Sequence, residues 1–142
     1  MPEKSSISTN SKFQIPYEAQ LNASQLEAVM ATEGPMLVIA GAGSGKTRTL
    51  TYRVARLVEG GVAPSSILLL TFTRKAAQQM LQRATRLLDR RCENVAGGTF
   101  HSFCNLILRK YAAALGIASN FAIFDRVDAE ALISLLRKEK PG

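Results

Sequence analysis

Short continuous runs of apolar residues separate the more polar segments of this sequence. Such runs occupy residues 36–39 and 67–70, each between turn-forming residues, and they predict strands buried on both faces of a parallel sheet. A third short strand is predicted over 95–99. We therefore expect a sheet built from these segments.

Between and after these runs, apolar residues recur at the three- and four-residue spacing of amphipathic helices. Asn22 and Gln25 have the spacing of a capping box at the start of the first helix, and a glycine pair at 60–61 ends the second. Asp125 or Asp128 is expected to cap the last helix. The apolar positions that define the helices lie within residues 26–30, 50–58, 76–88, 103–115 and 132–136.

The order of these segments decides the expected fold class. Strand, helix, strand and helix in succession imply right-handed crossovers, so we expect an α/β fold with a parallel sheet and helices on both of its faces. Residues 1–20 are rich in Ser, Asn and Lys and have no periodicity, so they are expected to form a flexible N-terminal arm.

The composition is that of a folded, basic protein. Of the 142 residues, 46% are hydrophobic and 20% are charged, which argues against global disorder. The formal net charge of +7 favours partners that carry phosphate, with a merely basic surface as the alternative. Two cysteines, no signal peptide and only short apolar runs favour a cytoplasmic protein without a membrane segment.

A glycine-rich segment joins the first predicted strand to the second predicted helix, and this context is typical of a phosphate-binding loop. Its residues are Ala40, Gly41, Ala42, Gly43, Ser44, Gly45, Lys46 and Thr47. Glycines let successive backbone N–H groups point inward, and the helix N-terminus adds a partial positive charge. We expect Lys46 to bridge the β- and γ-phosphates of ATP and the Thr47 hydroxyl to bind the accompanying Mg²⁺, so that both serve hydrolysis.

The first position of this loop departs from the standard pattern, because Ala40 stands where a glycine is usual. Three glycines remain at 41, 43 and 45, so the loop keeps its conformational freedom. An ordinary glycine-rich turn is the competing interpretation, and the Gly-Lys-Thr ending before a helix argues against it.

Four short motifs follow one another along the chain. They are Leu21-Asn22-x-x-Gln25, Gly41 to Thr47, Thr71-Phe72-Thr73 and Gly98-Thr99-Phe100-His101-Ser102. Together they resemble the motifs of the UvrD/Rep family of superfamily I DNA helicases. The resemblance covers residues 21–128 and implies a P-loop NTPase: part of a RecA-like first motor domain over 21–120, then the start of an inserted helical subdomain over 121–142.

The resemblance also implies an activity. Members of this family couple ATP hydrolysis, with Mg²⁺, to 3′–5′ translocation on single-stranded DNA and to the unwinding of duplex DNA. It assigns Gln25 to the adenine base, for which an amide has a suitable donor and acceptor, although the residues alone favour a helix-cap role. It places Arg48 near the nucleotide, with an ordinary surface charge as the alternative.

Contacts with single-stranded DNA are implied at two further motifs. The first comprises Thr71, Phe72, Thr73 and Arg74, and Arg74 replaces the asparagine usual in the family. Hydroxyl groups can bind phosphates, and the Phe72 ring can stack on a base, with a core position as its alternative.

The second motif contains Thr99, Phe100 and His101, the only histidine. A hydroxyl, a ring and an imidazole at a strand-to-helix junction suit the same stacking and phosphate contacts. Capping or packing is the competing role for the histidine.

Hydrolysis also requires a metal-organising carboxylate, a water-positioning group and usually an arginine finger. These groups are expected beyond Gly142, so the isolated chain should bind nucleotide weakly and turn it over poorly or not at all. Two other functions stay open: a P-loop phosphotransferase, such as a small kinase, that does not act on DNA, and a noncatalytic nucleotide-dependent DNA-binding module. Stimulation of turnover by single-stranded DNA separates the helicase from the kinase.

Overall fold

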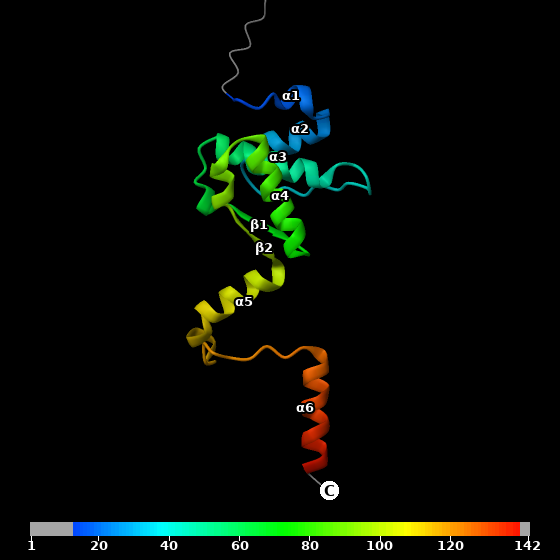
Figure 1. Cartoon of the computed structure of the whole chain (residues 1–142), viewed down its shortest axis with the longest axis vertical. Helices are drawn as coiled ribbons and strands as arrows, with labels where there is room; N and C mark the ends of the chain where they lie inside the picture. Colours follow the sequence, from blue (N-terminus) through cyan, green and yellow to red (C-terminus); the bar gives the residue numbers. More distant parts are fainter. Residues whose placement is uncertain (1–12, 140–142) are drawn as a thin grey trace, which may run out of the picture. The chain divides into compact units, whose positions relative to one another are not determined.

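The computed structural model describes residues 13–139, which divide after Phe100 into two compact units (Figure 1). The first unit contains α1 (Tyr17–Gln20), α2 (Ala23–Met30), α3 (Lys46–Glu59), η1 (Pro64–Ser66), β1 (Leu68–Thr71), α4 (Arg74–Leu87), η2 (Arg90–Asn94) and β2 (Ala96–Thr99). At the division begins α5 (Phe100–Lys110), and the second unit continues with η3 (Ala112–Leu115) and α6 (Arg126–Glu139).

β1 and β2 form a two-stranded parallel sheet in which Leu68 lies opposite Ala96 and Thr71 opposite Thr99. α4 connects the two strands and packs against both of them. Leu69 points to the helices and is buried, whereas Leu68, on the other face, is 44% exposed. The mixed α/β fold and the parallel pairing are confirmed, but in the part of the chain that the structure describes the helices cover one face of this sheet and not both.

The main core of the first unit lies between this sheet, α3 and α4. Side chains from both helices meet those of β1 and of the segment around η2, as the helical spacing of the apolar residues predicts. The buried residues of this cluster are Val54, Val58, Ile67, Leu69, Met80, Ala84, Cys92 and Val95.

A second buried cluster attaches the N-terminal residues to α3. Ile15 and Tyr17 are buried, and the Tyr17 hydroxyl donates a hydrogen bond of 2.6 Å to the Glu59 carboxylate. Burial, followed by this contact with Glu59, raises the pKa of Tyr17, which therefore stays protonated. Residues 13–20 thus differ from the flexible arm that the sequence predicts, while residues 1–12 lie outside the described residues.

The predicted helix ends are confirmed where a local hydrogen bond defines them. Asn22 accepts from the Gln25 backbone N–H at 2.9 Å, and Gln25 Oε1 accepts from the Asn22 N–H at 3.3 Å, which completes the capping box of α2. Asp125 caps α6 by accepting from the Asp128 N–H at 2.8 Å. Gly61 and Gly116 adopt positive φ values after α3 and η3.

The strand predicted over residues 36–39 is wrong for the structure described. This segment has no regular secondary structure, and its Leu37 and Ile39 side chains are 84% and 90% exposed. A strand requires a neighbour for its backbone hydrogen bonds, and the sheet found among the described residues contains only β1 and β2.

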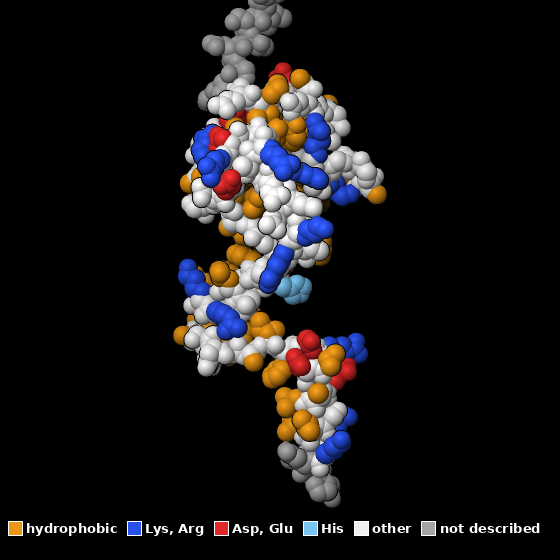
Figure 2. All heavy atoms as spheres, in the orientation of Figure 1, with side chains coloured by type: hydrophobic (Ala, Val, Ile, Leu, Met, Phe, Trp, Pro, Cys, Tyr) orange, Lys and Arg blue, Asp and Glu red, His pale blue; other side chains and the backbone are white. Residues whose placement is uncertain are grey.

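The second unit consists of helices with large apolar surfaces. Arg109 donates to the carbonyls of Ser119 and Phe121, at 2.9 and 3.3 Å, and so ties α5 to the loop that follows. Figure 2 shows apolar side chains along α6, where Leu135 is 59% exposed. No helix in residues 13–139 is long and apolar enough to cross a membrane. The assignment of 21–120 and 121–142 to a motor domain and an inserted subdomain stays a prediction.

Candidate functional site

The phosphate loop, residues 40–47, turns sharply into α3. Gly43 and Gly45 have φ values of 76° and 85°, and the Ser44 hydroxyl closes the turn by donating to the Gly41 carbonyl at 2.7 Å. Gly45 is the N-cap residue of α3, and a Cβ atom added to it would lie 2.6 Å from Gln25 Nε2. The backbone angle therefore favours glycine here, and a Cβ atom would also displace the end of the Gln25 side chain.

Lys46 lies over the loop that precedes it. Its ammonium donates to the carbonyls of Ala40 and Gly41, at 3.0 and 2.7 Å. The same side chain belongs to the first turn of α3, where the unpaired N–H groups of the helix carry partial positive charge. A phosphate group in the loop would replace these neutral carbonyl partners with a charged one, which is a stronger interaction for an ammonium.

Gln25 connects the start of α2 to the phosphate loop. While its Oε1 takes part in the capping box, its Nε2 donates to the Ser44 carbonyl at 3.1 Å. The helix-cap role favoured by the residues is confirmed, and adenine pairing stays a prediction. Each amide atom keeps one further hydrogen-bonding position, because the NH₂ group has two hydrogens and the oxygen two lone pairs.

A cavity of about 430 Å³ brings these groups together, within the volume range of small-molecule sites. A second cavity of about 330 Å³ adjoins it and shares Ala28, Val38, Lys46 and Thr49. The cavity of about 430 Å³ is here called the loop cavity. It is lined by Asn22, Ala23, Ser24, Gln25, Ala28, Val38, Ile39, Ala40, Ser44, Lys46 and Thr49.

Arg48 lies on a different face of α3 from Lys46. Its guanidinium donates to the Gln20 carbonyl at 2.8 Å and to the Tyr52 hydroxyl at 3.3 Å. Arg48 lines neither of the two cavities beside the phosphate loop. Its contact with a nucleotide therefore stays a prediction.

A pair of aromatic rings stands where the two parallel strands end. Phe72 and Phe100 follow the paired residues Thr71 and Thr99, and their ring centroids are 5.9 Å apart with the planes inclined by 50°. Phe72 is 93% exposed and Phe100 is 49% exposed. The core position considered for Phe72 is therefore wrong, and the ring face is accessible to a ligand.

The threonine hydroxyls beside this pair already have local partners. Thr73 caps α4 by accepting from the Ala76 N–H at 3.1 Å, and the Thr71 hydroxyl donates to the Thr73 carbonyl at 2.7 Å. The Thr73 hydroxyl still has its hydrogen to donate. Arg74, the first residue of α4, is exposed next to it.

The family model for the UvrD/REP helicase N-terminal domain matches residues 21–141. The chain belongs to the UvrD/Rep helicase family. Two relatives, the ATP-dependent DNA helicases PcrA of Staphylococcus aureus and of Staphylococcus epidermidis, are each 46% identical to it over 121 residues. The matched part is 84% of this chain and 17% of each relative, so the chain spans a small part of their length.

Membership of the UvrD/Rep helicase family implies that the chain contains part of a RecA-like domain. The same match contradicts the alternative prediction that this chain is a P-loop phosphotransferase.

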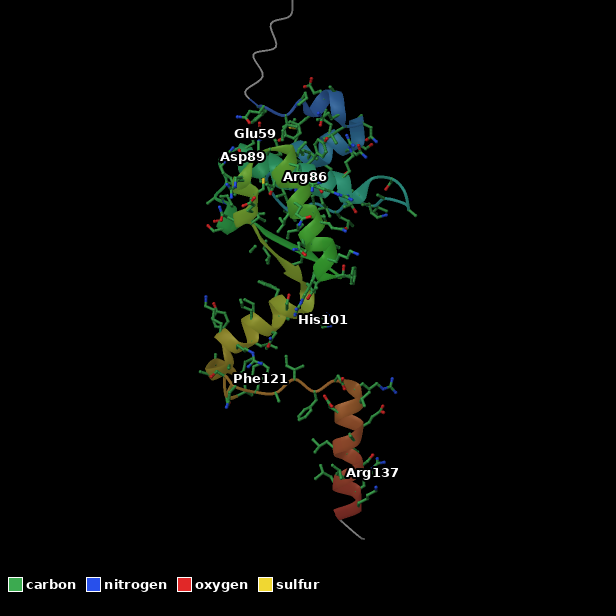
Figure 3. All side chains as sticks on the ribbon, in the orientation of Figure 1. Glu59, Arg86, Asp89, His101, Phe121 and Arg137 are labelled. Carbon is green, nitrogen blue, oxygen red and sulfur yellow. The ribbon has the colours of Figure 1, made fainter. Side chains whose placement is uncertain are left out.

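His101 is the residue after Phe100 and is the first residue of the second unit, whereas Phe100 belongs to the first unit. It is exposed on the first turn of α5 (Figure 3). Its contact with DNA stays a prediction, as do the roles of Thr99 and Arg74.

Sequence reasoning missed Thr49 as a lining residue of both cavities at the phosphate loop. Its hydroxyl donates to the Gly45 carbonyl at 3.2 Å, and only 8% of the residue is exposed. The signal was present, because Thr49 comes three residues after Lys46 and so lies on the same helix face.

Proposed function

We propose that this chain is the N-terminal, nucleotide-binding part of an ATP-dependent DNA helicase. ATP hydrolysis at the phosphate loop would drive 3′–5′ translocation on single-stranded DNA and the unwinding of a duplex. The names of the PcrA relatives support ATP and DNA as the ligands. The observation that carries the proposal is the loop cavity, where Lys46 and Gln25 meet the glycine-rich turn.

The residues of this loop fit a magnesium-bound triphosphate. The ammonium of Lys46 lies over a turn that ends in the N-terminus of α3, and Thr47, with its exposed side chain, is the next residue of that helix. In this arrangement Lys46 would hold the β- and γ-phosphates, and the Thr47 hydroxyl would be a ligand of the metal. Bound Mg²⁺ would neutralise charge on the phosphate oxygens.

The base end of the nucleotide is assigned to Gln25. Its remaining amide hydrogen and lone pair match the donor and acceptor that adenine presents at N6 and N7. Arg48 reaches the nucleotide only if its guanidinium leaves the Gln20 carbonyl. Its contribution to nucleotide binding is therefore expected to be smaller than that of Lys46 or Gln25.

Single-stranded DNA is assigned to the carboxyl ends of β1 and β2. Bases stack on the exposed Phe72 and Phe100 rings, because stacking on an aromatic face tolerates any base. The remaining contacts are to phosphates, from hydroxyl, guanidinium and imidazole groups. They come from Thr71, Thr73, Arg74, Thr99 and His101.

We also propose a more complete fold for the motor domain. In it, β1 and β2 belong to a larger parallel sheet that helices cover on both faces. Support comes from Leu68, which is 44% exposed on the uncovered face, because burial stabilises by about 25 cal/mol for each Å² of apolar surface removed from water. The family match to a RecA-like domain is consistent with this sheet.

The decisive experiment measures ATP hydrolysis by a helicase that contains this chain, with and without single-stranded DNA. We expect strong stimulation by DNA, and a loss of at least about 100-fold in Lys46→Ala, because transition-state charge on the phosphates is no longer stabilised. Lys138→Ala removes an equal charge from an exposed site on α6 and should leave turnover unchanged.

Turnover that does not respond to DNA, or that survives in Lys46→Ala, would contradict the proposal. Binding without turnover in such a helicase would instead favour the noncatalytic DNA-binding module. For the isolated chain we expect weak binding of a fluorescent ATP analogue and little or no hydrolysis.

A further inference from the structure

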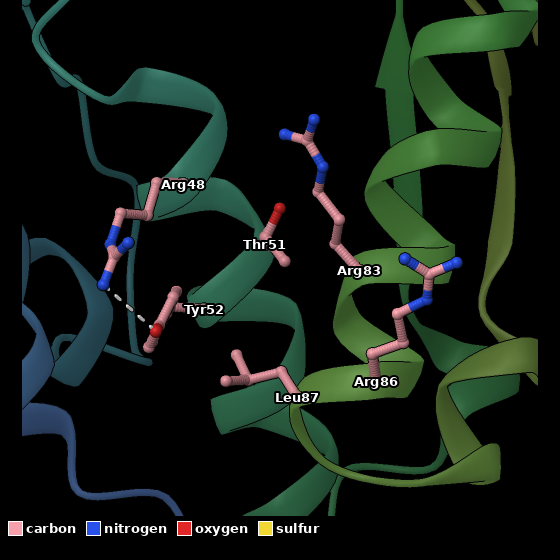
Figure 4. A pocket seen from close by; sticks show the side chains of 6 residues that line it. All are labelled: Arg48, Thr51, Tyr52, Arg83, Arg86 and Leu87. Carbon is pink, nitrogen blue, oxygen red and sulfur yellow. Dashed lines mark hydrogen bonds between the residues drawn. The ribbon is translucent and has the colours of Figure 1, made fainter.

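A third cavity, of about 400 Å³, lies between α3 and α4 (Figure 4). Its lining shares no residue with the two cavities beside the phosphate loop. This cavity is therefore separate from the loop cavity. Its lining, here called the arginine pocket, comprises Arg48, Thr51, Tyr52, Arg83, Arg86 and Leu87.

The arginine pocket contains three positive charges and no carboxylate in its lining. Arg83 and Arg86 make no hydrogen bond or ion pair with any residue between 13 and 139. The acidic residue of α3 is Glu59, which binds the Tyr17 hydroxyl, and α4 has none. The exposed guanidinium groups of Arg83 and Arg86 thus keep their donors available, and a bound anion would supply the missing negative charge.

The floor of the pocket lies between its exposed arginines. Tyr52 is 7% exposed and Leu87 is half-buried, so these two side chains form a fixed surface against which a ligand can rest. The hydroxyls of Thr51 and Tyr52 donate to the Thr47 carbonyl and to Gln20 Oε1, so the donors available to a ligand are the guanidinium N–H groups.

From these contacts we infer that the arginine pocket is a second anion site, which binds a phosphate group independently of the phosphate loop. A phosphate presents several oxygens to guanidinium forks at once, and a doubly charged group matches a triply charged pocket better than one carboxylate does. The phosphate can belong to a free phosphate compound or to the backbone of a nucleic acid.

The test uses the full 142-residue chain carrying Lys46→Ala, which removes the ammonium of the phosphate loop. NMR signals of the arginine Nε–Hε groups are followed during separate titrations with pyrophosphate and with an oligothymidylate. We expect saturable shifts of the Arg83 and Arg86 signals with at least one probe. Pyrophosphate alone would identify a free phosphate compound as the source, and the oligonucleotide alone a nucleic acid backbone.

Matched variants separate this pocket from general basic charge. Arg83→Gln with Arg86→Gln should weaken binding of the active probe at least about tenfold, since charge-assisted contacts are lost. Arg90→Gln with Arg137→Gln removes the same charge from exposed sites elsewhere and should change affinity less than twofold. Arg48 is left intact, so a nucleotide role of that residue does not confuse the result.

Three outcomes would overturn the inference. They are the absence of saturable shifts with both probes, equal weakening by the two double variants, and equal binding of a polyglutamate peptide, which would indicate a surface for acidic proteins. If the glutamine variant loses its far-UV circular dichroism, Arg83→Lys with Arg86→Lys takes its place. That variant keeps the charge but loses the forked geometry, and unchanged affinity in it would also count against a guanidinium site.

Discussion

At the scale of single residues, Gly45 shows how one position serves both the backbone and the site. Its φ of 85° is one that other residues rarely adopt, and a Cβ atom would lie 2.6 Å from Gln25 Nε2. Gly41 differs on both counts, because its φ is not positive and a Cβ there would meet nothing within 4 Å.

We therefore predict that Gly45→Ala lowers the free energy of unfolding by about 1–2 kcal/mol and weakens binding of an ATP analogue. Gly41→Ala is the control and should change stability by less than about 0.5 kcal/mol. Urea unfolding followed by circular dichroism and titration with a fluorescent ATP analogue measure both effects. Equal losses in the two variants would show that the backbone angle at Gly45 is not what matters.

Phe72 offers the opposite case, a large apolar side chain that packs little. Because it is 93% exposed, Phe72→Ala should leave the unfolding free energy unchanged within about 0.5 kcal/mol. Loss of one stacked base should nevertheless weaken binding of an oligothymidylate by about 1–3 kcal/mol, measured by fluorescence anisotropy. Phe124→Ala, which removes a 59% exposed ring from the second unit, should not change DNA affinity. Unaltered DNA binding in Phe72→Ala would exclude the ring as a stacking platform.

At the scale of elements, the sequence predicted what short-range interactions determine. The capping box of α2 and the Asp125 cap of α6 depend on residues three apart, so their spacing could be recognised directly. Residues 36–39 show the limit, since an apolar run specifies a preference for burial while a strand also needs a neighbour.

The same distinction applies to the candidate site. The phosphate loop and the strand ends could be found from local motifs. The second role of Gln25, its hydrogen bond to the Ser44 carbonyl, joins residues nineteen positions apart and depends on how α2 packs beside α3. The arginine pocket likewise exists only because α3 and α4 lie side by side.

The capping box gives a prediction for an element. Asn22→Ala removes the acceptor for the Gln25 N–H and should destabilise the chain by about 1 kcal/mol in thermal or urea unfolding. Asn22→Asp retains an acceptor next to the helix N-terminus and should cost less than half as much. Since Gln25 also contacts the phosphate loop, we expect Asn22→Ala to weaken binding of an ATP analogue as well. A stability loss as large in the Asp variant would contradict the capping explanation.

At the scale of the whole molecule, the two units differ in how much apolar surface they bury. The first unit has two clusters of buried side chains. Among the described residues of the second unit, in contrast, Ala112 is the only buried apolar residue. Local stability follows such burial, so hydrogen exchange should be slow in α3 and α4 and fast in α6. We therefore expect the first unit to be much more stable against local unfolding than the helices of the second unit.

Met80 provides the test of this difference. It is 5% exposed within the cluster formed by α3, α4 and β1, so Met80→Ala should leave a cavity and cost about 2–5 kcal/mol. Hydrogen exchange measured by mass spectrometry should then accelerate throughout α3 and α4 while α6, already fast, stays the same. Leu135→Ala, at a 59% exposed position of α6, should alter neither region by more than about 0.5 kcal/mol. Equal acceleration of exchange in α6 and α4 after Met80→Ala would mean that the two units unfold as one, because only a shared core transmits the loss of a single buried side chain to both.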